Sequence, residues 1–450
     1  MLNGKINRRN ILGGMAAASA ATYVAGPRAA NAVVKPKGNI PATPIKFGHM
    51  TFLSGPGAVL GEGSLRGYTL AAEEINAEGG FLGKRKIETV VADEAAGTSA
   101  NVVELRRMKL SEKIDWFTGV IAAGNTLALG PVAEELQIPS FFTDGCADPL
   151  FEKLIPQPHY VFRATNILSS DSIALALAVH QAWPEVRKIA HIHPDYVFGR
   201  YQQAHFDAAI KKKIPQAQSI FQSWPKLGNA DFNSHITTIM AAKPDLLVTS
   251  LWGADYTNFY KQAVRQGLFD TMKVACNLGF GSNPEAVEKD HPDGVLAGVH
   301  GNYHFTYPPA AKWPINKRFV ESYHKRWKQY PALEAEGAYT ALYLIKQAIE
   351  KANKLVGGWP DTDTIIEMLK GSMIQAPSGY VYVRPEDNSA MKDVAIGFSK
   401  NLPEYPFPVW DPDRVMVFPI RAVTAPAEWP KPGNGHNELS AAMDWINKTW

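Results

Sequence analysis

Between residues 45 and 300 the sequence alternates short apolar runs with stretches that repeat an apolar residue every three or four positions. Runs such as KIETVVAD, PSFFTD, KIAHIHP and PDLLVTSLW are rich in Val, Ile and Phe, as buried strands are. Stretches such as ALGPVAEELQI and YQQAHFDAAIKKK carry one apolar stripe and predict helices. This alternation predicts parallel sheets with crossover helices, and 450 residues suffice for two such domains.

After Trp313 the pattern changes. FVESYHKRWKQY, EAEGAYTALYLIKQAIEKANKL and TDTIIEMLKG predict helices, and SGYVYVRPEDNSAMKDVAIGFSK predicts a strand pair that turns at PEDN. The Pro/Gly-rich stretch TAPAEWPKPGNGH then predicts a linker ahead of an amphipathic C-terminal segment.

The first 32 residues differ in kind from the rest. Arg8 and Arg9 precede the Ala/Gly-rich run ILGGMAAASAATYVAG, and Ala30-Asn31-Ala32 forms an A-x-A cleavage signal. This order predicts a secretory signal peptide of the twin-arginine kind, cleaved near Ala32, and hence a periplasmic protein. The alternative is a cytoplasmic chain with a basic N-terminus.

The charge balance supports no polyanionic partner. The four basic residues of the predicted signal, with no acid among them, account for the formal net charge of +3, so the remainder carries about −1. We therefore expect neither nucleic acid nor an anionic membrane as partner. Outside the signal, no apolar run reaches the roughly 18 residues that cross a bilayer, so we expect no direct membrane insertion.

The glycine-rich turn SGPGAVLGEGS follows an apolar run, as a nucleotide-binding loop would. However, Gly55, Gly57 and Gly61 give G-x-G-x-x-x-G, which is one residue too long for the dinucleotide fingerprint. Pro56 also removes a backbone donor that a pyrophosphate would need. We therefore expect no nucleotide cofactor here.

No catalytic or metal motif emerges either. His191 and His193 share one face of a strand, but no third ligand stands at motif spacing, which favours hydrogen-bonded histidines. Cys146 has no sequence-local base. Cys146 and Cys276 lack metal spacing, and we expect them as free thiols in different lobes rather than as a disulfide. The chain is predicted not to be an enzyme and to need no cofactor or metal.

Two loops of small residues, VIAAGNTLA (120–128) and FTDGCADPL (142–150), follow predicted strands. Small side chains at a helix start expose backbone N–H groups, which suits a carboxylate. Such loops at the carboxyl ends of parallel strands form the ligand crevice of open α/β sheets. Ordinary strand-to-helix turns would have the same composition.

Four segments together resemble the extracytoplasmic solute-binding proteins of branched-chain amino-acid type ABC importers. They are SGPGAVLGEGSLRGYTLAAEEINAEGGFLGKR, GVIAAGNTLALGPVAEELQIPSFFTDGCADP, HPDYVFGRYQQAHFDAAIK and PDLLVTSLWGADYTNFYKQAVRQGL, in family order from about Ile45 to Lys400. The resemblance implies an α/β fold of the type I periplasmic binding protein class, with two doubly wound lobes joined by a three-crossover hinge. It implies these bounds: an N-terminal lobe at 45–164 and 302–375, a C-terminal lobe at 165–301 and 376–425, and a tail at 426–450.

The resemblance also implies a ligand site in the cleft between the lobes. Anion-binding loops of the family match Ala123, Gly124, Asn125 and Thr126, and also Gly145, Cys146 and Ala147. Leu60 matches a pocket-lining side chain, and Phe198 and Trp252 match aromatic covers. Leu278 stands where amino-acid binders place an acid that holds the ligand's ammonium group.

Leu278 therefore predicts a ligand other than an α-amino acid, unless Glu334 or Asp255 substitutes, because a buried ammonium without a counter-charge costs several kcal/mol. We expect a small carboxylate with an apolar or aromatic body, captured by hinge closure and delivered to a membrane permease. The alternatives are a branched-chain or other amino acid or an amide as ligand, a ligand-sensing receptor of the same fold, and an exported enzyme.

Overall fold

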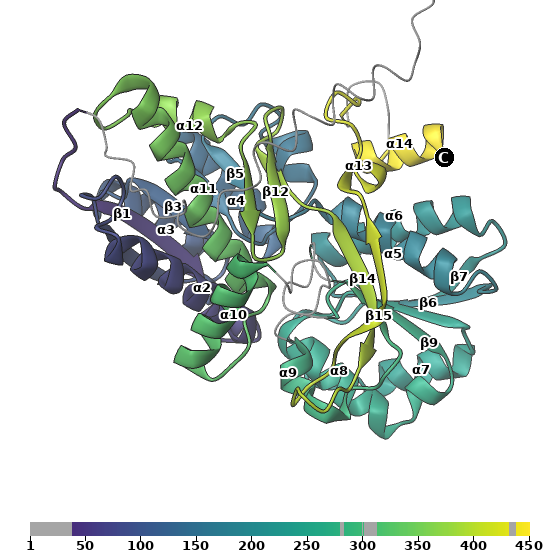
Figure 1. The fold of residues 1–450 in the computed structure, drawn as a ribbon. Coiled ribbons are helices and arrows are strands. Elements are labelled where there is room, and N and C mark those ends of the chain that lie inside the picture. The colour runs from purple at the N-terminus through teal and green to yellow at the C-terminus, as the bar shows by residue number, and fades with distance from the viewer. Residues whose placement is uncertain (1–37, 280–282, 299, 301–312, 432–437) are drawn as a thin grey trace, which may run out of the picture.

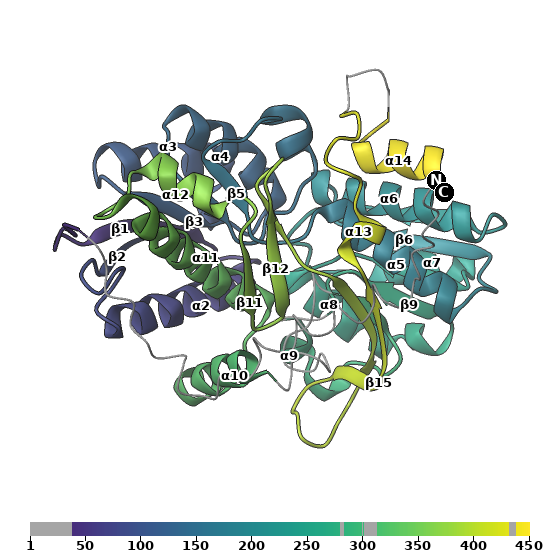
Figure 2. The same cartoon turned by 45° about the horizontal axis from the view of Figure 1, so that its top comes forward.

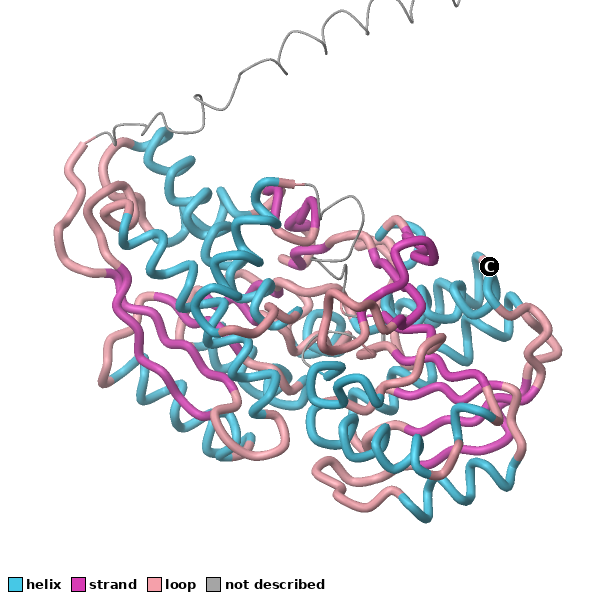
Figure 3. Tube along the Cα trace, turned by 60° about the horizontal axis from the view of Figure 1, so that its bottom comes forward, coloured by secondary structure: helices cyan, strands magenta, loops and turns pink. Residues whose placement is uncertain are grey.

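The computed structural model describes residues 38–279, 283–298, 300, 313–431 and 438–450. Its strands form two sheets, each in a lobe of its own (Figure 1). Helices flank the strands in both lobes, as the tube in Figure 3 shows. The predicted signal peptide, residues 1–32, lies outside the described residues.

The first sheet has the strand order β11-β12-β13-β5-β4-β3-β1-β2, and β1 to β5 run parallel. Its strands are β1 (Ile45–Thr51), β2 (Ile87–Asp93), β3 (Trp116–Gly119), β4 (Ser140–Phe142), β5 (Val161–Arg163), β11 (Met373–Ala376), β12 (Gly379–Arg384) and β13 (Ser389–Met391). The helices of this lobe are α2 (Ala58–Ala77), α3 (Thr98–Leu110), α4 (Ala123–Glu135), α10 (Pro314–Trp327), α11 (Leu333–Val356) and α12 (Thr362–Leu369), with the turns η2 (Glu94–Ala96) and η3 (Leu150–Leu154).

The second sheet has the order β15-β14-β10-β9-β8-β6-β7, and β6 to β10 run parallel. Its strands are β6 (Lys188–Ile192), β7 (Gln218–Ser223), β8 (Leu246–Thr249), β9 (Lys273–Cys276), β10 (Leu296–Gly298), β14 (Val394–Lys400) and β15 (Val409–Phe418). The helices here are α5 (Leu168–Ala182), α6 (Val197–Lys213), α7 (Asn233–Ala242), α8 (Gly253–Arg265), α9 (Asn283–Val287), α13 (Ile420–Val423) and α14 (Ala441–Thr449), with the turns η4 (Leu268–Asp270) and η5 (Glu288–Asp290).

Apolar burial on both faces of the parallel strands explains the alternation seen in the sequence. In the first lobe, Phe47 on β1 and Phe141 on β4 lie in the same core as the long helix α11. Helix α2 crosses α11 so closely that a Cβ at Gly67 would lie 2.0 Å from the Ala335 carbonyl oxygen. The glycine is therefore a packing requirement, and the two helices lie side by side in Figure 2.

The described strands place three passages of the chain between the two sheets, after β5, after β10 and after β13. The third passage differs from the predicted bounds. The strand pair around the PEDN turn is present as β12 and β13, yet both belong to the first sheet, whereas the sequence analysis assigned 376–425 to the second lobe. Ser389 pairs with Arg163 of β5, and the Asn388 side chain donates to the Val161 carbonyl, which holds these strands to the first sheet.

Among the residues that the structure describes, no helix combines the length and the apolar character needed to cross a bilayer. The C-terminal tail, which the sequence predicted as an amphipathic segment, forms α14 and packs against α6 of the second lobe.

We expect Gly67→Ala to lower the free energy of unfolding by about 1–3 kcal/mol, because the added methyl group would push α2 away from the α11 backbone. Chemical denaturation measures this. Gly124→Ala is the matched control, since a Cβ there meets nothing within 4 Å. Equal stability of the two variants would contradict the packing role of Gly67.

Candidate functional site

A cavity lies where the carboxyl edges of the two sheets face each other. Parallel strands bring their following loops to one edge of the sheet, so loops distant in sequence converge there. The loops after β1, β3 and β4 meet those after β6, β8, β9 and β10. The lining residues are Leu60, Ile121, Ala123, Asp144, Cys146, Tyr196, Phe198, Trp252, Leu278 and His300.

The structure brings six of the predicted site residues together around this cavity. Both lobes contribute, and the lining side chains of Leu60, Phe198, Trp252 and Leu278 are only 2–6% exposed. The rings of Tyr196 and Phe198 stack with centroids 5.9 Å apart. The predicted residues at the cavity are Leu60, Ala123, Cys146, Phe198, Trp252 and Leu278; Ala147 belongs to the same apolar cluster.

The lobes touch across the cleft at the glycine-rich turn. The Pro56 carbonyl accepts a hydrogen bond from the N–H of Ala254 at 3.1 Å. Gly253 has φ +58°, and a Cβ there would lie 2.6 Å from the Pro56 oxygen. The glycine-rich turn, which resembled a nucleotide-binding loop, therefore forms one edge of the closed cleft. Pro56 has no backbone N–H to donate, but its carbonyl accepts a hydrogen bond from the other lobe.

Three of the predicted anion-binding residues have internal roles. The Asn125 side chain donates to Glu94 at 2.9 Å and accepts from the Thr98 hydroxyl at 2.7 Å. The Thr126 hydroxyl donates to the Gly145 carbonyl at 3.1 Å, and a Cβ on Gly145 would lie 2.1 Å from the Thr126 methyl carbon. The Thr126 side chain thus holds its loop against the Gly145 loop, and the Asn125 side chain is taken up by Glu94 and Thr98.

The carboxyl of Glu94 binds two of the backbone N–H groups that were expected to bind a ligand anion. This buried carboxyl accepts the N–H groups of Ile121 and Ala122, each at 2.8 Å. Burial raises the pKa of Glu94 to about 7, although these hydrogen bonds act to lower it. The N–H groups of Ala123 and Gly124, in the first turn of α4, have no hydrogen-bond partner in the described part of the chain. The donors left for a ligand are therefore fewer than the sequence suggested.

The polar end of the cavity holds a buried histidine between two carboxyls. His300 Nδ1 lies 2.5 Å from Asp171 Oδ2, its Nε2 lies 3.8 Å from Asp144 Oδ1, and the Cys146 sulfur is 3.7 Å from Nε2. Burial lowers the pKa of His300, but its acidic neighbours Cys146 and Asp171 more than offset this and leave the pKa well above 6.5. Burial raises the pKa of Asp144 to about 6.

Burial also raises the pKa of the Cys146 thiol, and the neighbouring His300 opposes this shift. Burial raises the pKa of Asp171 as well, while His300 acts to lower it, so the two side chains stabilise each other's charged forms across their 2.5 Å contact. The indole N–H of Trp252 interacts with the Tyr196 hydroxyl but makes no hydrogen bond of good geometry in the described chain.

Sequence reasoning missed Ile121, Asp144, Tyr196 and His300 at the cavity, and Glu94 behind it. Asp144 and His300 each come just after a strand, which is the signal that could have identified them. The proposed substitute acids lie elsewhere. Asp255 accepts the N–H of Gly228 at 3.0 Å, and neither Asp255 nor Glu334 lines the cavity.

The other candidate motifs are structural. His191 Nδ1 lies 3.1 Å from His193 Nε2, and His193 Nδ1 lies 2.8 Å from the Ser250 hydroxyl, so the pair forms a hydrogen-bonded chain. Within the described ranges, no group of three or more His, Cys, Asp or Glu side chains could hold a metal ion. Cys146 and Cys276 are both buried free thiols, as predicted.

Comparisons with known proteins agree with this architecture. The family model described as "Periplasmic binding protein" matches residues 44–400. Leu/Ile/Val-binding protein homolog 7 of Brucella suis biovar 1 (strain 1330) is 26% identical over 322 residues, covering 70% of this chain and 78% of that protein. Leu/Ile/Val-binding protein homolog 8 of Brucella melitensis biotype 1 is 24% identical over 404 residues, covering 86% and 93%.

Solved structures share the fold. A solute binding protein of an ABC transporter from Rhodopseudomonas palustris BisB5, in complex with 3,4-dihydroxy benzoic acid, superposes with TM-score 0.73 at 21% identity, covering 86% of this chain and 100% of that one. A leucine binding protein, LivK, from Thermotoga maritima MSB8 has TM-score 0.67 at 20% identity, covering 83% and 97%.

The chain therefore belongs to the periplasmic binding protein family, and the predicted family and fold class are confirmed. Family and fold are those of transporter solute-binding proteins, not of enzymes.

We expect Gly253→Ala to disfavour the closed cleft, because its methyl group would collide with the Pro56 carbonyl of the other lobe. Small-angle X-ray scattering of the ligand-free protein should show a larger radius of gyration. Gly267→Ala is the control: its φ of +70° imposes a similar backbone strain, but its Cβ would only approach Asp270 at 3.5 Å within the same lobe. An unchanged radius in Gly253→Ala would contradict this closure contact.

Proposed function

We propose that this protein is the extracytoplasmic solute-binding component of an ABC importer, and that it captures a small carboxylate with an apolar or aromatic body. The observation that carries the proposal is the composition of the cavity. Aromatic and aliphatic side chains from both lobes surround it, and a charged histidine and the start of α4 lie at its polar end.

The apolar part of such a ligand would lie against Trp252, Phe198 and Leu60. Its carboxylate would accept the N–H groups of Ala123 and Gly124 and pair with the His300 imidazolium. Helix N-termini and imidazolium groups both favour negative charge, and burial strengthens both interactions. The edge of the His300 ring faces Phe198, with centroids 6.1 Å apart, which brings the apolar and polar ends within one small ligand's reach.

Hinge closure is the proposed mechanism of capture. The cavity has a volume of about 20 Å³, which is the space of roughly one water molecule, so a solute would enter only when the lobes separate and would be enclosed by lobes that close less fully than they do here. A ligand that contacts both walls then stabilises the closed state by its differential affinity for it. The closed, loaded form would be what a membrane permease recognises, in the periplasm, after removal of the signal peptide near Ala32.

An amino acid is the second candidate ligand, and Asp144 is the observation that favours it. The sequence argument against amino acids rested on Leu278, yet Asp144 brings a carboxyl to the same cavity from the other lobe. Proteins of this fold include one solved with 3,4-dihydroxy benzoic acid and one named as a leucine binding protein. A ligand-sensing receptor would use the same site with a different membrane partner.

Asp144→Asn separates the two ligand classes. For an anionic ligand, loss of the Asp144 charge should preserve or tighten binding, whereas an ammonium group would lose its counter-charge and bind at least tenfold more weakly. Thermal-shift screening of both proteins against aromatic acids, aliphatic acids, amides and amino acids measures this. Stabilisation of the wild type by leucine or valine alone, lost in Asp144→Asn, would overturn the aromatic-acid proposal.

The pH dependence of binding provides the same distinction without a mutation. Because burial raises the pKa of Asp144 to about 6, its carboxyl becomes neutral as the pH falls from 7.5 to 5.5. The raised pKa of His300 favours its protonated form, and Glu94, whose pKa burial raises to about 7, also becomes neutral as the pH falls and shifts ligand binding in the same direction as Asp144. An aromatic acid should therefore bind more tightly as the pH falls, by at most about tenfold per pH unit for each of the two carboxyls, and an amino acid more weakly.

We expect Trp252→Ala to weaken ligand binding by about 30-fold or more, because the indole forms much of the second lobe's wall. Isothermal calorimetry with the ligand found by screening measures the loss. Trp183→Ala, a substitution distant from the cavity near the amino end of β6, should leave affinity unchanged. Equal affinity of Trp252→Ala and the wild type would show that the ligand binds elsewhere.

A further inference from the structure

The C-terminal tail contacts both lobes. The tail begins at Thr424, two residues before the bound that the sequence implied, and comprises the described residues 424–431 and 438–450. On the second lobe, the Ser440 hydroxyl lies 2.6 Å from His205 Nε2 on α6, and Lys212 donates to the Asn447 carbonyl at 2.9 Å. On the first lobe, the carboxyl of Glu152 in η3 accepts the N–H of Ala441 at 3.1 Å. The tail thus spans the interface between the lobes, beside α6 in Figures 1 and 2.

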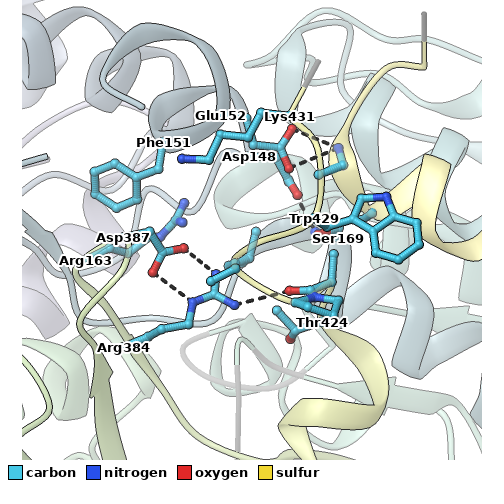
Figure 4. A pocket seen from close by; sticks show the side chains of 16 residues that line it. Asp148, Phe151, Glu152, Arg163, Ser169, Arg384, Asp387, Thr424, Trp429 and Lys431 are labelled. Atoms are coloured by element: carbon cyan, nitrogen blue, oxygen red, sulfur yellow. Dashed lines mark hydrogen bonds and ion pairs between the residues drawn. The ribbon is translucent and has the colours of Figure 1, made fainter. Parts of the chain in front are cut away.

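The other part of the tail makes a second bridge, of which Figure 4 shows the contact of Arg384. The Thr424 hydroxyl lies 2.7 Å from that of Ser170 in α5 of the second lobe. Arg384, which ends β12 of the first sheet, donates to the Ala425 carbonyl at 3.2 Å. Lys431 donates to the carbonyl of Pro156, which lies between η3 and β5, at 2.7 Å.

The tail is held unequally by the two lobes. Ala442 and Ile446 of α14 are at most 1% exposed and belong to the apolar core of the second lobe. The contacts with the first lobe described above are hydrogen bonds, and they surround a cavity of about 40 Å³. At that cavity Asp148 Oδ1 and Arg163 Nε have no hydrogen-bond partner in the described chain. Apolar burial contributes more free energy than such hydrogen bonds do, so the tail is bound more strongly to the second lobe than to the first.

The bridge adjoins the walls of the ligand cavity. Leu439 packs against the apolar cluster that contains Phe198 and Trp252, and its carbonyl accepts the Tyr201 hydroxyl at 3.4 Å. On the other side, Glu152 belongs to the turn that directly continues the Cys146–Ala147 loop. The segment from Leu439 to Ala441 therefore connects one wall of the cavity to the other.

We propose that the C-terminal tail is a brace that favours the closed cleft, with Glu152 as a positioning residue whose bond to Ala441 must break when the lobes separate. The brace rests on the proposed hinge closure, and it adds a contribution to closure that needs no ligand. Because a ligand of the closed state has an apparent affinity proportional to the closed fraction, the brace would also raise affinity without touching the ligand.

Two variants remove the same bond from opposite sides. Glu152→Ala deletes the acceptor. Ala441→Pro deletes the donor at the first position of α14, where proline suits a helix, and Ser440 before it already has the extended φ −149° and ψ 164° that proline requires. Nitroxide labels at Val103→Cys and Val264→Cys, one exposed apolar side chain in each lobe, report lobe separation by double electron–electron resonance.

Both variants should increase the open fraction of the ligand-free protein by about fivefold, the effect of one net hydrogen bond. Glu152→Gln keeps an acceptor oxygen and should stay closed. It also mimics the neutral carboxyl, since burial, with Asp148, raises the pKa of Glu152 to about 8. Lys212→Ala removes only an exposed hydrogen bond to the last turn of α14, which Ala442 and Ile446 still anchor to the second lobe, and it should also stay closed.

Wild-type label distances in Glu152→Ala, or opening in only one of the two bond-deleting variants, would overturn the brace. Opening in Lys212→Ala equal to that in Glu152→Ala would do the same. Circular dichroism checks that each variant is folded. Because no ligand is added, this outcome is independent of whether aromatic acids bind.

Discussion

The facing carboxyl edges of two parallel sheets are the constraint on which the rest of the structure depends. Each parallel strand must return through a helix, so its functional loop always emerges at the same edge. Two such edges opposed across a hinge bring Leu60, Cys146, Trp252 and His300 to one cavity, although they are spread over more than half of the chain. The strand topology, rather than any local sequence motif, therefore determines which residues line the cavity.

Closure of this cleft depends on contacts that are each modest. The hydrogen bond between Pro56 and Ala254 joins the two edges of the cleft, and the absence of a side chain at Gly253 permits this close approach. The tail contributes polar contacts on the flank, where Glu152 meets the start of α14. Hydrogen bonds at the edge of the cleft suit the proposed opening, because water can replace them at little net cost.

The electrostatics of the polar end determine which ligands fit. His300 and Asp171 compensate each other in a buried pair, and Asp144 adds a carboxyl whose pKa lies near 6. Glu94 already takes two of the loop's backbone donors. In the proposed function, a ligand anion would therefore rely on the remaining backbone donors and on His300, and the charge state of Asp144 would favour either an acid or an amine.

The sequence by itself predicted two α/β domains, because strand–helix alternation admits few topologies, and its resemblance to a known family matched six residues that line the cavity. It could not assign β12 and β13 to the first sheet, since their pairing depends on Ser389 and Asn388 meeting β5 from more than 200 positions away. Asp144, His300 and Asp171 likewise share no local spacing. Only the tertiary structure brings these side chains together, because they come from loops of both lobes. It also shows that the side chains of Asn125 and Thr126 bond to Glu94 and to the Gly145 carbonyl within the first lobe.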